Sequence, residues 1–187
     1  LWAAAEDAPA ADDAKAAVLK LADRCGIARR GPDSLDACVP APRVALAASV
    51  LTMRSSGDAS QPATDERGNA LCWNGEWFQG GPAPDAADAP AVLALLAEAT
   101  AGAPDAETAA ARAADALADR MRGPYALAFY CAAARTLLYC RDPFGRRSLV
   151  VNGTRVASTA PRDDGAGWTE VTTQGVHYMG GGCAEWP

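Results

Sequence analysis

Six cysteines and a single histidine are the side chains of this chain that could carry nucleophilic chemistry. With His177 as the only histidine, any Cys–His or Ser–His arrangement must use it, and its strand-like surroundings favour a structural role. The cysteines show no Cys-x-x-Cys pair and no metal-ligand spacing, and no phosphate-binding glycine loop is present. The sequence therefore predicts no metal site and no cofactor. Thiols within apolar runs are expected to be reduced and buried; the six are Cys25, Cys38, Cys72, Cys131, Cys140 and Cys183.

A run of strands in the second half of the chain must position any reactive side chains. Residues 123–131 alternate bulky and small side chains, which predicts a strand with one packed face and one face against a second layer. A turn over 132–135 and an antiparallel partner over 137–140 follow, and Asp142-Pro143 then interrupts the ladder. We expect a third strand of the same sheet over 148–152. Further strands are expected over 43–53, 155–158 and 171–178, and helices over 12–24, 88–100 and 105–122, which predicts a layered α+β domain.

The two ends of the chain read differently from its middle. Residues 1–11 are rich in alanine and acidic residues, which predicts a loosely ordered N-terminal arm. The run Gly180-Gly181-Gly182 predicts a flexible C-terminal tail over 179–187. The expected domain therefore covers residues 12–178.

Two motifs in this domain resemble a known family. The run Arg141-Asp142-Pro143-Phe144-Gly145-Arg146-Arg147-Ser148-Leu149, preceded by Gly123-Pro124-Tyr125-Ala126, resembles the signature of class II glutamine amidotransferase domains. Arg30-Gly31-Pro32-Asp33 resembles the Arg-Gly-Pro-Asp that follows the first helix in the same family. The double arginine before serine is most similar to the asparagine synthetase domain-containing branch. The resemblance implies a four-layer αββα sandwich of the N-terminal-nucleophile hydrolase type, in which Arg30, Gly31, Pro32, Arg141, Asp142 and Gly145 are motif residues with structural roles.

The family hydrolyses the side-chain amide of glutamine, and the resemblance assigns parts of that chemistry to this chain. Trp73-Asn74-Gly75-Glu76 resembles the family's Asn-Gly-Glu, so Asn74 and Gly75 would form the oxyanion hole. Without the surrounding motifs, Asn-Gly would be interpreted as a tight turn. Asp88 falls where the family holds the substrate ammonium. The alternative is an ordinary helix N-cap, and Asp85 is a rival for either role.

The arginine that would hold the substrate carboxylate is not at its family position. Counting back from Gln61-Pro62, that position falls near Ser49-Val50, and neither side chain can bind a carboxylate. Arg43 and Arg54 lie nearby in the sequence and are interpreted as solvated or structural charges.

The nucleophile is also missing from its family position, which lies near Leu1 or Trp2. Residues 2–11 lack the β-branched apolar run expected of the first strand. Cys25-Gly26-Ile27 matches the family's opening tripeptide, but it lies too close to Arg30 and would need cleavage after Arg24 to expose an α-amine. Cys25 is therefore interpreted as a thiol at a helix end, and as catalytic only in the alternative below.

Composition restricts the partners of the chain. A net charge of −6 and a pI near 4.8 argue against a nucleic-acid surface, and no apolar run is long enough to span a bilayer. The expected location is a reducing compartment, either the cytoplasm or an organellar matrix or stroma.

Three functions remain open. The favoured hypothesis is a catalytically degenerate amidotransferase domain that serves as an accessory subunit, with other proteins as its partners and without a small-molecule substrate. The alternative is an active glutaminase that uses an N-terminal cysteine, either upstream of Leu1 or exposed at Cys25. A third hypothesis is a sensor that binds an amino acid through Asn74, Gly75 and Asp88 without turnover.

Overall fold

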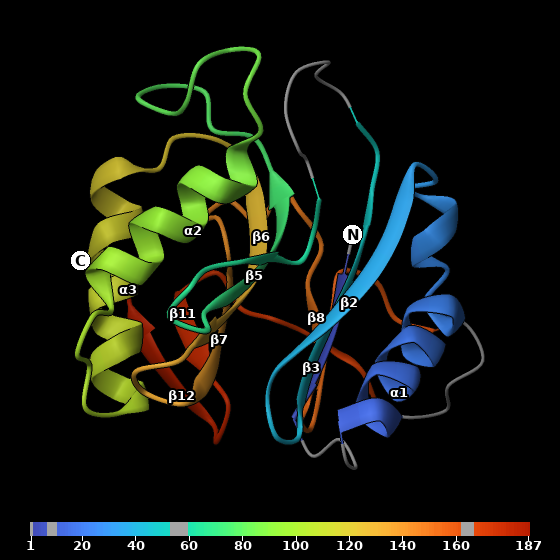
Figure 1. The fold of residues 1–187 in the computed structure, drawn as a ribbon. Coiled ribbons are helices and arrows are strands. Elements are labelled where there is room, and N and C mark those ends of the chain that lie inside the picture. Colours follow the sequence, from blue (N-terminus) through green and yellow to red (C-terminus); the bar gives the residue numbers. More distant parts are fainter. Residues whose placement is uncertain (1, 7–10, 53–59, 162–166) are drawn as a thin grey trace.

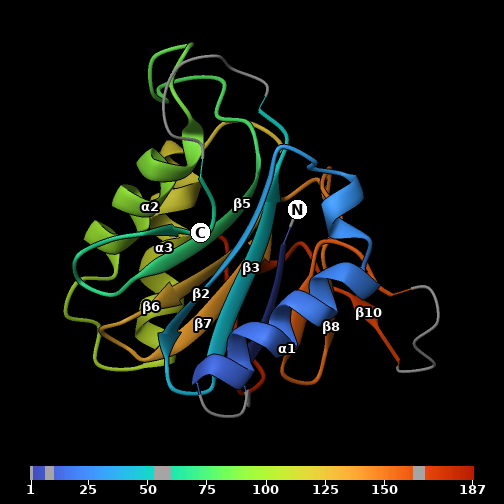
Figure 2. The ribbon, with the colours of Figure 1, turned by 45° about the vertical axis from the view of Figure 1, so that its right-hand side comes forward.

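Two antiparallel sheets of six strands each face one another in the computed structural model, which describes residues 2–6, 11–52, 60–161 and 167–187 (Figures 1 and 2). In the first sheet the strand order is β10 (Thr169–Glu170), β8 (Val150–Asn152), β9 (Arg155–Ala157), β1 (Trp2–Glu6), β3 (Val44–Val50) and β2 (Ser34–Ala41). In the second sheet it is β12 (Gly182–Glu185), β11 (Gly175–Tyr178), β7 (Thr136–Arg141), β6 (Tyr125–Cys131), β5 (Ala70–Gly75) and β4 (Ala63–Thr64).

Helices cover the outer face of each sheet. Helix α1 (Ala11–Arg24) packs on the first sheet and is followed by the short 3₁₀ helix η1 (Ile27–Arg29). Helices α2 (Asp88–Ala99) and α3 (Ala106–Arg120) pack on the second sheet, on the far side of the molecule from α1 (Figure 1). The order helix, sheet, sheet, helix confirms the expected four-layer αββα sandwich, and the three expected helices are confirmed within a residue or two of their ends.

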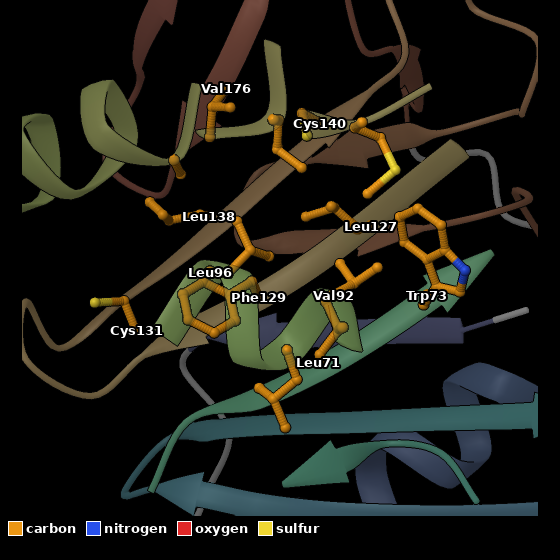
Figure 3. Packing of buried hydrophobic residues seen from close by; sticks show 14 of the residues in the cluster. Leu71, Trp73, Val92, Leu96, Leu127, Phe129, Cys131, Leu138, Cys140 and Val176 are labelled. Carbon is orange, nitrogen blue, oxygen red and sulfur yellow. The ribbon is translucent and has the colours of Figure 1, made fainter. Parts of the chain in front are cut away.

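The alternation of side-chain size in the strands explains the layering. In β6, Leu127 and Phe129 point to the helix side, whereas Ala126 and Ala128 point to the layer between the sheets. Figure 3 shows the helix-side cluster, where Phe129 lies near Leu96 of α2. Ala126 and Ala128 let the two sheets approach at this point, and Leu127 and Phe129 fill the space under α2 and α3.

The prediction of a loosely ordered arm over residues 1–11 is wrong for its first part. Residues 2–6 form β1, which pairs with β3 on one side and β9 on the other, and residues 11–12 begin α1. Residues 1 and 7–10 lie outside the described part. The strand was missed because alanine carries no strand signal; backbone pairing on both edges holds it, and residue type does not encode that pairing.

The expected flexible tail over 179–187 is wrong as well. Residues 182–185 form β12, which pairs with β11. Gly182 lies against the Tyr178 ring, so closely that a Cβ there would be 1.9 Å from the ring carbon Cζ. The indole nitrogen of Trp186 donates to the Thr173 carbonyl at 2.8 Å. Glycine at 182 therefore permits a close approach instead of forming a linker.

Two further strand predictions need correction. The strand at 150–152 does not continue the sheet of β6 and β7: the chain crosses after Arg141, and β8 joins the first sheet. Strand β2 was not predicted, because Pro40 and a mostly solvent-facing pattern hide an edge strand. None of the described helices is long and apolar enough to cross a membrane.

Candidate functional site

A pocket of ≈ 730 Å³ opens where the ends of β3 and β5 meet the start of α2 and the loop after β7. Both sheets contribute to it, because β3 belongs to one and β5 to the other. A volume of this size is in the range of small-molecule sites. The polar and charged residues that line it are Arg30, Ser49, Thr52, Gln61, Asn74, Glu76, Asp88, Arg146, Arg147 and Ser148.

The Asn74–Gly75 end of β5 is fixed from both sides. Both residues pair with β6, and the Gln61 carboxamide oxygen accepts a hydrogen bond from the Trp73 N–H at 2.7 Å. Gly75 leaves no room for a side chain, since a Cβ would lie 2.5 Å from the Pro124 carbonyl oxygen. The Asn74 carboxamide makes no hydrogen bond within the described residues, although it lines the pocket. Its N–H donors are therefore available to a ligand.

The loop after β7 is held by a buried carboxylate. Asp142 is fully buried and accepts four hydrogen bonds, from the backbone N–H groups of Tyr125, Phe144 and Arg146 and from Nε of Arg146. Nη2 of Arg146 donates to the Gly123 carbonyl at 2.7 Å. This carboxylate thus ties the start of β6 to the loop that carries Arg146 and Arg147 into the pocket wall.

Arg141 supports the same loop from behind. Its guanidinium pairs with Glu170 and donates to the Gly145 carbonyl. Gly145 adopts a left-handed φ of 62°, and a Cβ there would lie 2.5 Å from Nη2 of Arg141. Arg141, Asp142 and Gly145 therefore support the pocket wall without lining the pocket.

The Arg-Gly-Pro-Asp motif lies against the end of β3. Gly31 packs so closely that a Cβ would be 2.7 Å from the Ser49 carbonyl carbon, and the Ser49 hydroxyl donates to the Ile27 carbonyl at 2.8 Å. Pro32 forms an isolated bridge to Val50. Gly31 and Pro32 are thus structural, whereas Arg30 lines the pocket and its guanidinium makes no ion pair or hydrogen bond within the described residues.

Asp88, and not its rival Asp85, lines the pocket. The N-cap of α2 is Ala87, so Asp88 is not the cap; its buried carboxylate accepts from the Trp77 N–H at 3.0 Å. This bond joins the start of α2 to the segment after β5. Asp88 therefore lines the same pocket as Asn74 and Gly75.

No cysteine is among the residues that line this pocket in the described part of the chain. Cys25 is buried under α1 in the cluster that includes Val18 and Ile27. Cleavage after Arg24 would also remove β1 from the middle of its sheet. Cys72 lies between the sheets, where burial raises the pKa of its thiol well above the usual value and disfavours a thiolate. The described structure forms no disulfides, and Cys25, Cys72, Cys131 and Cys140 are buried as expected.

The other positions considered from sequence lie apart from the pocket or outside the described part. His177 stacks on Tyr139, and its Nε2 lies 3.2 Å from the Thr172 hydroxyl and 3.8 Å from Sγ of Cys183. Among the described residues, no group of three or more potential metal ligands occurs. Arg43 does not line the pocket, and Arg54 lies outside the described residues.

Two charged residues of the pocket were not recognised from the sequence as a pair. Nη2 of Arg147 lies 3.6 Å from Oε1 of Glu76, and both side chains are partly exposed. Glu76 directly follows Asn74-Gly75, and Arg147 directly follows Arg146, whose side chain binds Asp142. The available signal was that each residue belongs to a family motif.

The four-layer sandwich and the pocket that gathers Asn74, Gly75 and Asp88 agree with the resemblance to class II glutamine amidotransferases. The chain is 30% identical over 129 residues to asparagine synthetase domain-containing protein 1 from Bos taurus, a match covering 67% of this chain and 19% of that protein. It therefore spans about a fifth of that relative. A glutamine phosphoribosylpyrophosphate amidotransferase from B. subtilis, complexed with ADP and GMP, aligns with a TM-score of 0.45 and 18% identity, over 74% of this chain and 35% of that chain. No family model matches the chain.

Proposed function

We propose that the pocket binds the side-chain amide of glutamine and supports its hydrolysis, supplying ammonia to a partner. The proposal rests on the direction of strand β1 relative to β3. Trp2 lies opposite Ala48, and β3 continues from there to Ser49 and Val50 in the pocket wall. Because the two strands are antiparallel, the Trp2 end of β1 points toward the pocket. A nucleophile carried at that end would face the pocket that Asn74 and Gly75 line.

The chemistry assigned to the site is amide cleavage by an N-terminal cysteine. The sulfur attacks the amide carbon while the α-amine of the same residue takes the thiol proton, and the C–N bond breaks as that proton passes to the leaving ammonia. Water then releases glutamate from the thioester. The Asn74 carboxamide and the Gly75 N–H are the groups placed to stabilise the oxyanion.

The test is turnover of glutamine combined with covalent labelling. We expect the purified protein to release glutamate and ammonia, and a diazoketone analogue of glutamine to label an N-terminal cysteine found by mass spectrometry. Asn74→Ala should lower kcat by about 10²–10³, the usual cost of one lost oxyanion donor. Absence of product and of label in the full-length protein would contradict the proposal.

A second candidate is the degenerate accessory subunit, and the burial of Cys25 under α1 favours it over a Cys25-based glutaminase. This role is supported if the protein is silent toward glutamine yet co-purifies with other subunits from native extracts. A lone monomer in those extracts would contradict it. Calorimetry with glutamine and asparagine separates the third possibility, a sensor that binds without turnover through Asn74, Gly75 and Asp88.

A further inference from the structure

Strand β5 has one edge against β6 and a second edge that is covered over part of its length. In the described part of the chain, β4 pairs with this second edge at Leu71 and Ala70, through Ala63 and Thr64. The residue before Ala63 is Pro62, which has no N–H to donate to a ladder. Backbone pairing with β4 therefore ends before the pocket end of β5.

The side chain of Gln61 continues this ladder for one more position. In the register of β4 and β5, residue 61 falls opposite residue 73, and the Gln61 carboxamide oxygen accepts a hydrogen bond from the Trp73 N–H at 2.7 Å. Because the carboxamide oxygen is the acceptor, its NH₂ group keeps its donors for other partners, and Gln61 lines the pocket. A side chain thus does at Trp73 what the backbone of β4 does at Leu71.

The N–H groups of β5 alternate between its two edges, as they do in any strand. The Glu76 N–H donates to the Pro124 carbonyl on the β6 side, whereas the Trp73 N–H donates to Gln61 on the opposite side. Gly75 lies two residues after Trp73 and one before Glu76, so its N–H points to the side of Gln61. No described strand pairs with that side of Gly75, and Gly75 lines the pocket.

We propose that Gln61 is a positioning residue for amide cleavage: its carboxamide holds the Trp73 N–H and thereby directs the Gly75 N–H into the pocket. The inference rests on the proposed function, in which the Gly75 N–H stabilises the oxyanion. A backbone strand in place of Gln61 would hold Trp73 equally well, but it would also pair with Gly75 and occupy this donor. A donor that is held in place before the reaction stabilises a developing charge without first having to reorient.

The competing interpretation is that Gln61 stabilises the fold and does nothing more. A neutral hydrogen bond of this kind contributes about 0.5–1.5 kcal/mol to stability. Loss of a purely structural bond would lower the free energy of unfolding but leave kcat of the folded protein unchanged. Loss of a positioning residue lowers kcat, and it changes KM little because the oxyanion exists only after the substrate has bound.

The test compares Gln61→Met, which removes the carboxamide at similar side-chain length, with Gln61→Glu, which keeps an oxygen acceptor at the same place. Hydrogen exchange followed by NMR reports on the backbone. We expect the Trp73 amide to exchange at least about tenfold faster in Gln61→Met and to stay slow in Gln61→Glu. The Cys72 amide faces β6 and should be unchanged in both variants. With glutamine as substrate, Gln61→Met should lower kcat by about tenfold and change KM by less than about threefold.

Gln79→Met is the matched control, because Gln79 is exposed and does not line the pocket. We expect it to change neither kcat nor the exchange of the Trp73 amide. Unchanged exchange of that amide in Gln61→Met would overturn the inference, and so would turnover of glutamine at an unchanged kcat. In both cases the proposed function would stand. If the unaltered full-length protein does not turn over glutamine, the proposed function and the inference are overturned together.

Discussion

The two sides of the pocket are held in different ways. On one side, Asn74 and Gly75 continue a strand that is paired along its length, and Gly75 has no room for a side chain. On the other side, Arg147 and Glu76 face each other at ion-pair distance with no hydrogen bond. Backbone pairing and close packing thus hold Asn74 and Gly75, whereas one long contact joins the charged groups of Arg147 and Glu76.

We expect the largest loss of stability from Asp142→Ala. The substitution leaves three backbone N–H groups and Nε of Arg146 without their acceptor. We expect a loss of about 3–5 kcal/mol in the free energy of unfolding, measured by denaturant titration. The control is Asp119→Ala on the exposed face of α3, which should change it by less than about 0.5 kcal/mol. Equal effects of the two variants would refute the supporting role of Asp142.

Gly75→Ala should destabilise the end of β5 through a steric clash at one position. The new methyl group would lie 2.5 Å from the Pro124 carbonyl oxygen and 2.6 Å from Cβ of Tyr125. We expect a cost of about 1–3 kcal/mol, seen in thermal or denaturant unfolding, together with loss of glutamine binding. Gly167→Ala is a matched control, because its Cβ would meet nothing within 4 Å. A stable, binding-competent Gly75→Ala protein would show that this end of the pocket is not rigid.

The adjacent arginines sharpen the comparison. Arg146→Ala removes hydrogen bonds to Asp142 and Gly123, so we expect a loss of about 1–2 kcal/mol in stability. Arg147→Ala removes only the long contact with Glu76 and should cost less than about 0.5 kcal/mol. Denaturant titration of both variants measures the difference. If Arg147→Ala were the more destabilising of the two, the contact between Arg147 and Glu76 would contribute more to stability than its length suggests.

The smallest expected effect lies away from the pocket and concerns pH. Burial lowers the pKa of His177 below its ordinary value of 6.5, although the bond to Thr172 acts in the opposite direction. The unfolded chain therefore binds a proton that the folded chain resists, and stability should fall as pH drops through about 6.5 toward the folded pKa. Unfolding measured over this range should show a shallower pH dependence for His177→Gln. Identical slopes would contradict the assignment.

Sequence reasoning succeeded where large side chains recur with a period. Strands β6 and β7 carry leucine, phenylalanine and tyrosine, α2 carries valine and leucine on its buried face, and α3 repeats buried alanines with a helical period. It failed at β1 and β12, which are rich in small residues, because such residues can occupy a strand but do not favour one. Long-range backbone pairing decides those strands.

The residues of the candidate site were also predicted only in part. Asn74 and Gly75 were found because they form a family motif and Asp88 because it falls at a family position, and all three line the pocket. The Arg147–Glu76 pair was missed because its members come from different segments and meet only after the chain has crossed between the sheets. No local pattern encodes a contact of that kind.

The pairing of Ala3 with Ala157 joins the beginning of the chain to a segment near its end. Strands β6 and β7 form a hairpin and can pair early, whereas β1 must wait for β9 to be synthesised. Folding during translation should therefore leave one edge of β1 open until late, which makes that edge the point at which a stalled chain would be captured by chaperones.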